Sequence, residues 1–306
     1  MNILVLGVAF TDIKGFPCGA YDPFGTNKGN VVVTHGGVAR NAAEDLANLG
    51  AQVEFPCMLD DSPFSGDVSA RLKRAGVSLA HAVRVKSGGI GIWLAVFDEK
   101  GDLAGSISQM PDTAPLECLL DEQGDALISA CDVVCAEFDA GERMSECTLE
   151  IAERYRKDVF TVIGNMSVTG RRQDLMARTR CVIMNGIEAG KLFSCEIDAA
   201  LPQDALTLVW AAGKSMGLRA IIVTLGAAGC VYADFGSGEC GCLPAQSCKV
   251  VDTTGTGDAF FSAAIMSIAR GQSLRRACEN GSHIAARVIS LTESACPRGS
   301  GDIFED

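Results

Sequence analysis

Short apolar runs alternate along this chain with longer segments in which apolar residues recur at helical spacing. The run NILVLGVAF, residues 2–10, is rich in strand-forming residues and is followed by polar ones, so it predicts a buried first strand. The same argument predicts further strands at residues 53–59, 132–138, 159–164, 181–186 and 220–226.

Helices are predicted between these strands. In VARNAAEDLANLG, residues 38–50, the apolar positions Val38, Ala42 and Leu46 fall on one face and Gly50 ends the pattern. Because apolar strands alternate with helices, we predict a mostly parallel sheet that is covered on both faces. The other predicted helices are a stretch ending at Gly76 and residues 145–157, 202–217, about 257–270 and 273–290.

Two stretches, residues 12–35 and 88–108, interrupt this alternation. The first contains the strand-like sequence GNVVVTH, and the second reads as two strands joined by a tight turn at residues 98–101. Both stretches emerge after a predicted core element. We therefore expect them to pair into a small separate sheet inserted into the α/β fold.

The composition narrows the class of partner. The 306 residues carry a formal net charge of −12, which argues against nucleic acid and anionic membranes as partners but permits a small anion bound by backbone N–H groups. The N-terminus has no basic region, and its apolar run is too short for a signal peptide or a membrane span, so a cytoplasmic protein is expected. None of the 14 cysteines has zinc-site spacing, so we interpret them as small core residues.

The sequence VVDTTGTGDAFF, residues 250–261, predicts an anion site where a strand meets a helix. Backbone N–H groups in a first helical turn lack partners, and glycines let a ligand approach them. Asp258 within this turn is either a capping residue or a functional carboxylate. The chain has neither a Walker A loop nor a dinucleotide-binding fingerprint, which points to another phosphoryl-transfer design.

Four segments together resemble the ribokinase-like, PfkB-type carbohydrate and nucleoside kinases. They are HGGVARNAAEDLANLG (35–50), MNGIEAGKL (184–192), TLGAAGCVY (224–232) and DTTGTGDAFFSAAI (252–265). The resemblance implies one kinase domain over residues 1–306, with a three-layer α/β/α fold and a β-sheet lid made by residues 12–35 and 88–108.

The resemblance also implies roles for single residues. Asp258 would be the catalytic base, beside an anion hole at Gly255, Thr256 and Gly257. Asn185 and Glu188 would hold Mg²⁺ through water, although Asn-x-x-Glu is equally a helix capping box. Residues implied for ATP binding are Asn185, Thr224, Gly226, Gly229, Gly257 and Asn280.

A K⁺ site is implied at Asp252 and Thr254. Its second half would lie near residues 290–294, where SLTESACPRG departs from the family's usual form.

For the acceptor, the resemblance implies Asp12, Gly36, Gly37, Arg40 and Asn41. Arg40 is either a substrate-reading residue, as in pseudouridine kinases, or a solvent-facing helix arginine. Trp93 or Phe97 could offer an apolar face to a base or belong to the core of the lid. The basic residues of the lid stretches and their flanks are scattered and form no cluster, so an uncharged acceptor is favoured; they are Lys14, Lys28, Arg84, Lys86 and Lys100.

The sequence thus supports an ATP-dependent kinase of the 5′-hydroxyl of a nucleoside, with pseudouridine first. A kinase of a free sugar such as ribose is the second hypothesis, and a catalytically silent ligand-binding or regulatory protein is the third. Two inserted β stretches leave open strand edges, so a homodimer through the lid is also expected.

Overall fold

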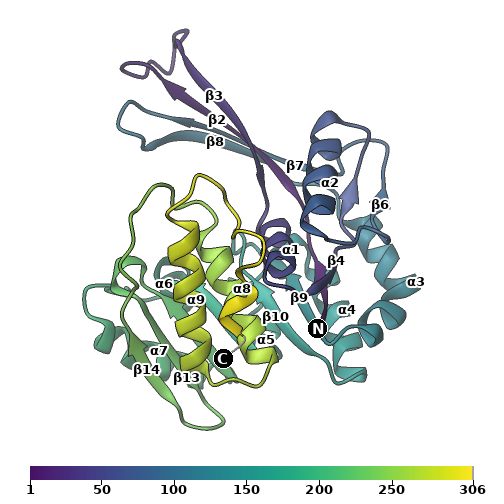
Figure 1. Cartoon of the computed structure of the whole chain (residues 1–306), viewed down its shortest axis with the longest axis vertical. Helices are drawn as coiled ribbons and strands as arrows, with labels where there is room; N and C mark the ends of the chain where they lie inside the picture. Colours follow the sequence, from purple (N-terminus) through teal and green to yellow (C-terminus); the bar gives the residue numbers. More distant parts are fainter. Residues whose placement is uncertain (305–306) are drawn as a thin grey trace.

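The chain forms two main sheets that lie apart from each other in the computed structural model, which describes residues 1–304 (Figure 1). The larger is eight-stranded, in the order β14-β13-β12-β11-β10-β9-β1-β4. Its first six strands in sequence are parallel, and the last two are antiparallel at one edge. They are β1 (Asn2–Leu6), β4 (Gln52–Glu54), β9 (Val133–Glu137), β10 (Asp158–Val162), β11 (Cys181–Asn185), β12 (Ala220–Thr224), β13 (Cys230–Asp234) and β14 (Cys240–Leu243).

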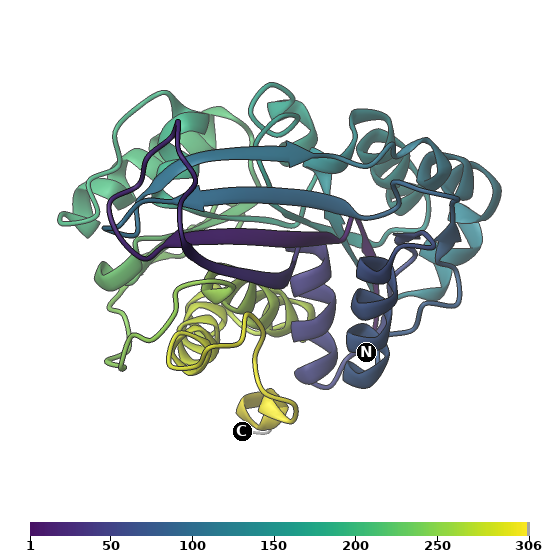
Figure 2. The same cartoon turned by 90° about the horizontal axis from the view of Figure 1, so that it is seen from above.

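Helices cover both faces of the large sheet, as the uniformly apolar strands predict (Figures 1 and 2). Successive residues of a strand point to opposite faces, so Ile3 and Val5 pack into one layer while Leu4 and Leu6 pack into the other. The first layer contains α1 (Val38–Asn48), α2 (Pro63–Ala75), α8 (Thr256–Ala269) and α9 (Leu274–Val288). The second contains α3 (Ala114–Ala130), α4 (Glu142–Arg154), α5 (Gln173–Ala177), α6 (Gly186–Phe193) and α7 (Pro202–Ser215).

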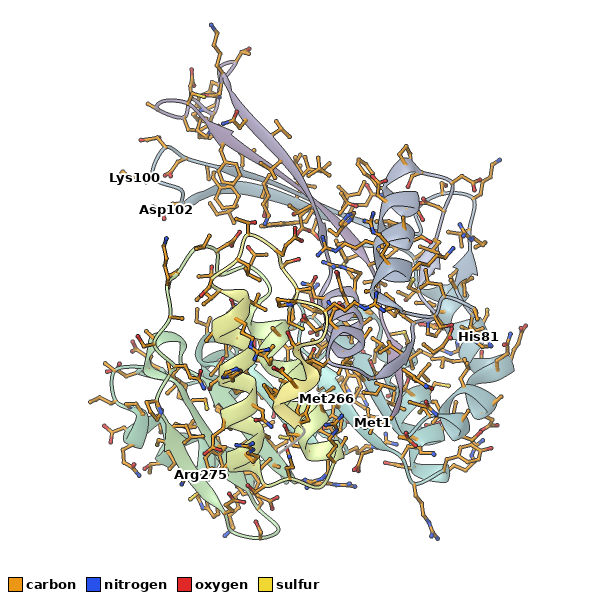
Figure 3. The ribbon with its side chains drawn as sticks, viewed as in Figure 1. Met1, His81, Lys100, Asp102, Met266 and Arg275 are labelled. Atoms are coloured by element: carbon orange, nitrogen blue, oxygen red, sulfur yellow. The ribbon has the colours of Figure 1, made fainter. Side chains whose placement is uncertain are left out.

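The predicted separate sheet is present. Its order is β3-β2-β7-β8, and its strands are β2 (Phe10–Pro17), β3 (Gly29–Gly36), β7 (Gly91–Phe97) and β8 (Leu103–Gln109). Figure 3 shows Lys100 and Asp102 at its far end, away from the helices of the main body. Short strands β5 (Met58–Leu59) and β6 (Val83–Arg84) form a third sheet, and 3₁₀ helices are η1 (Phe138–Ala140), η2 (Gly226–Ala228) and η3 (Ser300–Phe304).

Several boundaries differ from the predictions. The run 2–10 divides between β1 and β2, and the run 53–59 divides between β4 and β5, because Pro56 lacks the N–H that a continuing ladder needs. The helix predicted at 145–157 is α4, which begins at Glu142 and ends at Arg154.

Helix α3 was not predicted. Pro115 and Gly124 weaken its sequence pattern, but Pro is tolerated in a first helical turn. Gly124 lets α4 approach closely, since a Cβ built there would lie 2.6 Å from Cδ1 of Ile151. Helices α5 and α6 were also missing from the predicted elements, although the capping-box alternative at Asn185 implied a helix start there.

The cysteines behave only partly as interpreted. All 14 are free, and those in the core are Cys57, Cys131, Cys135, Cys181, Cys230, Cys278 and Cys296, whereas Cys18, Cys118, Cys240 and Cys248 are exposed. Within residues 1–304, no helix is both long enough and apolar enough to cross a membrane.

Candidate active site

The glycine turn at the start of α8 passes close to Ser294 on one side and is open at Gly257. Gly255 is the N-cap with a left-handed φ of 77°, and a Cβ built on it would overlap the carbonyl oxygen of Ser294. A Cβ on Gly257 would meet only open space. The hydroxyl of Thr256 is buried and has no hydrogen-bond partner among the described residues. The turn therefore offers an uncovered helix N-terminus together with an unsatisfied polar atom.

Asp258 lies in this turn and is held by α1. Its Oδ2 accepts a hydrogen bond of 2.6 Å from Nδ2 of Asn41, which lies 217 residues away in sequence. Burial raises the pKa of Asp258 to about 6, while the Asn41 bond and the charge of Arg40 act in the opposite direction. A carboxylate with this pKa is mostly ionised at neutral pH and still basic enough to accept a proton.

Five of the residues predicted for phosphoryl transfer line one cavity of about 80 Å³. Gly257 and Asp258 line it from α8, Asn185 and Thr224 from the ends of their strands, and Glu188 from the first turn of α6. Asn185 ends β11 and Thr224 ends β12, and the two are register partners. The cavity thus lies at the carboxyl edge of the parallel sheet, where α/β proteins bind ligands.

Asn185 and Glu188 form the capping box that the sequence offered as an alternative. Oδ1 of Asn185 accepts from the N–H of Glu188 at 2.9 Å, and Oε2 of Glu188 accepts from the N–H of Asn185 at 2.8 Å. The Glu188 pKa is raised, mainly by burial. One carboxylate and one amide oxygen facing a cavity fit a Mg²⁺ ion that keeps most of its waters. No cluster of three or more His, Cys, Asp or Glu suited to a metal occurs in the part of the chain described.

The second predicted cluster lies where the small sheet joins α1. Asp12 is in β2 rather than directly after the first strand, and a Cβ on Gly36 of β3 would overlap its carboxylate. Gly37 has a φ of 91° and leaves no room for a Cβ, which would lie 2.9 Å from the Val8 carbonyl oxygen. Burial raises the pKa of Asp12, and the charges of Lys14 and Arg40 oppose this. The structure brings Asp12, both glycines and Asn41 to one junction.

Residues 2–297 match the model of the pfkB family carbohydrate kinases. The chain belongs to this family. A guanosine-inosine kinase from Exiguobacterium acetylicum is 31% identical over 293 residues, covering 96% of each protein. A pseudouridine kinase from Escherichia coli K12 is 24% identical over 309 residues, covering 96% of this chain and 97% of its own.

The fold comparison agrees. A structure of Arabidopsis thaliana ribokinase complexed with ribose and ATP has a TM-score of 0.84 at 17% identity and covers 100% of this chain and 99% of its own. The chain therefore has the ribokinase-like fold, and the protein is a phosphotransferase of the PfkB family.

Two predicted site residues of this PfkB kinase are buried among protein groups. The guanidinium of Arg40 is completely buried, so Arg40 is not a solvent-facing helix arginine. Asn280 is buried between α8 and α9, and its Nδ2 donates to Oγ of Ser267 at 3.0 Å and to Oε1 of Gln272 at 3.2 Å. Ser267 lies ten residues beyond Gly257, roughly 15 Å along the helix, so Asn280 packs α8 against α9 rather than lining the cavity.

The glycines predicted for the nucleotide shape a hairpin turn. Gly226 is the first residue of η2 and Gly229 directly follows it; both have a positive φ, and the N–H of Leu225 donates to the carbonyl of Gly229 at 2.7 Å. A Cβ on Gly229 would overlap the carbonyl oxygen of Leu243. The turn directly follows Thr224, which lines the cavity, but neither glycine is among the lining residues.

The two halves of the predicted cation loop lie together. The N–H groups of Val251 and Asp252 donate to the carbonyl of Ile289 at 2.8 and 3.2 Å. The N–H of Thr254 donates to Oδ1 of Asp252 at 2.8 Å. Residues 249–254 and 289–290 are therefore neighbours, as the prediction requires.

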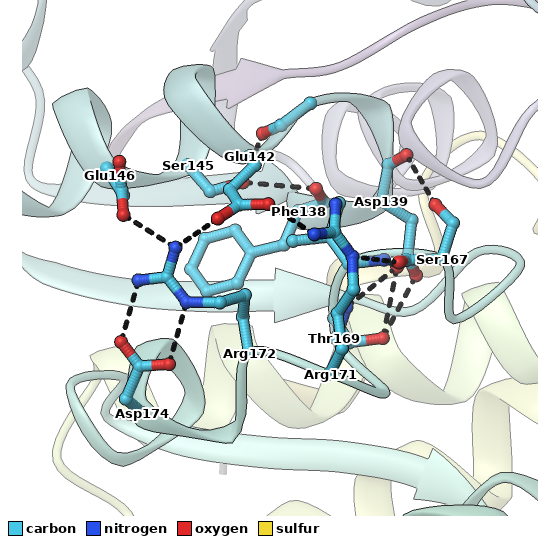
Figure 4. A network of polar contacts seen from close by, with 12 residues as sticks. Phe138, Asp139, Glu142, Ser145, Glu146, Ser167, Thr169, Arg171, Arg172 and Asp174 are labelled. Carbon is cyan, nitrogen blue, oxygen red and sulfur yellow. Dashed lines mark hydrogen bonds and ion pairs between the residues drawn. The ribbon is translucent and has the colours of Figure 1, made fainter.

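Sequence reasoning missed two carboxylates beside the site. Glu137 ends β9, is buried, and accepts from the N–H of Val8 at 3.1 Å; burial raises its pKa to about 8. Asp139 follows it and accepts hydrogen bonds from the N–H groups of Gly164, Met166, Val168 and Thr169, which fixes the loop after β10 (Figure 4). The signal was present in the sequence, because an apolar run that ends in two acids marks a strand end.

The aromatic residues of the small sheet take part in its packing. Phe97 stacks on Phe16 with ring centroids 4.9 Å apart. Trp93 is partly buried, packs against the second core layer, and is the register partner of Asp12. Trp93 is thus closer to the acceptor cluster than Phe97 is.

Proposed function

We propose that this PfkB kinase transfers the γ-phosphoryl group of ATP to the 5′-hydroxyl of a ribonucleoside. The observation that carries the proposal is the position of Asp258. Its carboxylate stands in the glycine turn of α8, shares a cavity with Asn185, Glu188 and Thr224, and is held by Asn41 next to Asp12.

The chemistry follows from this placement. The ionised Asp258 accepts the proton of the acceptor hydroxyl as its oxygen attacks the γ-phosphorus, and the bond to the β-phosphate oxygen breaks to release ADP. Backbone N–H groups of Gly255, Thr256 and Gly257 would stabilise the charge on the transferred group, and the Thr256 N–H would do so in place of its 3.3 Å hydrogen bond to the Thr253 carbonyl. Asn185 and Glu188 would hold Mg²⁺ through water, and this ion neutralises phosphate charge when bound. Asp252 and Thr254 would hold K⁺ beside the anion turn.

Lys14 supports a nucleobase over a bare sugar. Residues two apart on a strand share a face, so Lys14 lies on the face of β2 that carries Asp12. Its charge lowers the pKa of both Asp12 and Asp252. Lys14 is intermediate in exposure, and its side chain makes no hydrogen bond or ion pair to another side chain within residues 1–304. A ring carbonyl of a base would satisfy it.

Guanosine, inosine and pseudouridine all present a ring carbonyl, whereas adenosine presents an amino group at the corresponding purine position. We place guanosine and inosine first, because the relative at 31% identity is a guanosine-inosine kinase, and pseudouridine next, because that relative is at 24%. Asp12 and Asn41 would hold the ribose hydroxyls beneath the small sheet, which would act as a lid.

The test is ADP release with inosine, guanosine, pseudouridine, uridine, adenosine, ribose and no acceptor, with the product identified by mass spectrometry. We expect the highest kcat/KM with inosine or guanosine and a 5′-phosphate product. If kcat/KM with ribose were roughly tenfold higher than with the nucleosides, a difference of about 1.4 kcal/mol, the sugar-kinase hypothesis would be favoured instead. No turnover with any acceptor would favour the silent binding protein.

Two variants sharpen this test. Asp12→Ala should lower kcat/KM about ten- to hundredfold with every ribosyl acceptor, because hydrogen bonds from a charged group are lost. Lys14→Met should produce a loss of about that size with inosine but leave ribose and adenosine nearly unchanged. An equal loss with all three acceptors would mean that Lys14 contacts the sugar or the nucleotide.

We also propose a homodimer through the small sheet. Val31, Val33, Leu94 and Ile107 share the face opposite Asp12 and are 70%, 54%, 42% and 70% exposed. Strands β3 and β8 are the edges of this sheet. A second copy of the chain would cover both the apolar face and an open edge.

A further inference from the structure

Arg40 is buried in the middle of a polar cluster at the start of α1. Its side chain donates to the carbonyl oxygens of Gly36 at 3.3 Å and His35 at 2.6 Å, to Oε2 of Glu44, and to Oδ1 of Asn41. Its Nη2 also lies 3.5 Å from Oγ of Ser294. The ion pair with Glu44 is shared with Arg71, whose Nε lies 2.8 Å from Oε2 of Glu44.

The bond between Arg40 and Asn41 decides which way the Asn41 amide points. A guanidinium has only donors, so it can pair with the carbonyl oxygen of an amide but never with its NH₂ group. With Oδ1 held by Arg40, Nδ2 must point to the other side, where it donates to Oδ2 of Asp258 at 2.6 Å. Without Arg40, the amide could turn over and present its oxygen to Asp258.

We propose that Arg40 is a positioning residue for Asp258: through the Asn41 carbonyl it keeps the Asn41 NH₂ group turned toward the carboxylate. The role of Asp258 as base belongs to the proposed function, but the hydrogen-bond chain from Arg40 to Asp258 can be tested without turnover. This series of hydrogen bonds would explain why a fully buried arginine, Arg40, directly precedes Asn41.

The consequence is a lower proton affinity of the base. A hydrogen bond donated to a carboxylate favours its ionised form, whereas an amide oxygen in the same place favours the protonated form. The charged and titratable groups that act with Asp258 are Arg40 and Asp45 of α1, Cys135 and Glu137 of β9, and Glu188 of α6. Only Arg40 is cationic among them, so the test must separate its charge from its hydrogen bond.

Two variants together make this separation. Arg40→Gln removes the charge but keeps an amide donor for the Asn41 carbonyl, whereas the double variant Arg40→Met/Glu44→Gln removes the donor and keeps the net charge of the cluster. The titration of Asp258 is followed by NMR of ¹³C-labelled aspartate and assigned with Asp258→Asn. In the double variant we expect a midpoint about one to two pH units above that of the wild type, the worth of a hydrogen bond to a charged group. Glu44→Gln alone keeps the hydrogen bond from Arg40 to Asn41 and should leave the midpoint of Asp258 unchanged. Arg40→Lys retains a donor for Asn41, so its midpoint should lie close to that of the wild type.

A second measurement needs no variant at position 40. In the wild type, the side-chain N–H resonances of Asn41 should titrate with the midpoint of Asp258. Asn41 resonances that stay constant through that titration, or a folded double variant with an unmoved midpoint, would overturn the positioning role. Kinase assays at each pH report separately on the proposed function: if it is correct, the acid limb of kcat/KM moves with the NMR midpoint. A shifted midpoint in a protein without kinase activity would support the positioning role and reject the base function.

Discussion

At the scale of single residues, Asp258 is the first to test. Asp258→Asn keeps the size of the side chain and can still accept from Asn41. We expect kcat to fall by about 10²–10⁴, the usual worth of a general base, with little change in ATP affinity. Stopped assays for kcat and calorimetry for ATP binding measure the two effects. Asp302→Asn on η3, whose carboxylate pairs with Arg287 at the surface, should keep the full rate.

The same residue sets the pH dependence of the wild type. The base works only when ionised, and its pKa is about 6. kcat/KM should therefore fall about tenfold per pH unit below this value and level off above it. A flat profile between about pH 5 and pH 7 would contradict the assignment of Asp258 as the base.

Glu137 makes a prediction about stability. Its pKa is 4.5 in the unfolded chain and about 8 in the folded protein, so only the folded protein holds this proton between those values. Stability should thus fall as the pH rises through this window and level off above it. Glu137→Gln keeps an acceptor for Val8 but carries no charge. It should match the wild type near pH 5 and exceed it by roughly 1–4 kcal/mol near pH 8.5 in urea unfolding. Equal stability at both pH values would show that Glu137 is not buried as a neutral acid.

At the scale of elements, the first turn of α8 contains two glycines with different reasons to be there. Gly255→Ala should lower stability by at least about 1–2 kcal/mol, because its φ is left-handed and its Cβ would overlap Ser294. Gly257→Ala should leave stability equal or up to about 1 kcal/mol higher, since alanine favours a helix and the space is open.

Activity separates the two glycines in another way. Gly257→Ala should still reduce kcat/KM strongly, because the added methyl group would stand where the phosphate approaches. Thermal unfolding and kinetics of the matched pair test this. A stable, fully active Gly257→Ala variant would mean that the phosphate does not bind over this turn.

At the scale of the whole molecule, the outward face of the small sheet should hold two copies together. Ile107→Glu places a charge on that face and should convert a dimer to monomer in sedimentation or light-scattering measurements at micromolar concentration. Leu208→Glu on α7 changes an exposed leucine of the main body; it is the control and should leave the assembly unchanged. A wild type that is monomeric at such concentrations, or a dimer that survives Ile107→Glu, would contradict this interface.

The sequence by itself determined the alternation of strands and helices, because the spacing of apolar residues and the positions of glycines are local properties. The predicted strands and helices are present, although α3, α5 and α6 were missed, and α8 begins within one residue of its predicted start. The two β stretches form their own sheet. The cavity beside Asp258 also follows from sequence, since parallel strands bring Asn185 and Thr224 to one edge.

The tertiary structure alone decided which polar side chains meet. Asn41 reaches Asp258 across 217 residues, and no local spacing encodes that bond. Arg40 looked like a substrate or surface residue because arginine is seldom buried, yet its partners His35, Gly36 and Glu44 surround it. Asn280 fell on a helix face that α8 covers. Helix α3 depended on Gly124 fitting Ile151. The contacts of Asn41 and Gly124 join segments distant in the chain, whereas those of Arg40 lie within five residues but are buried by the fold. In each case burial and packing or hydrogen bonding outweigh the local preference.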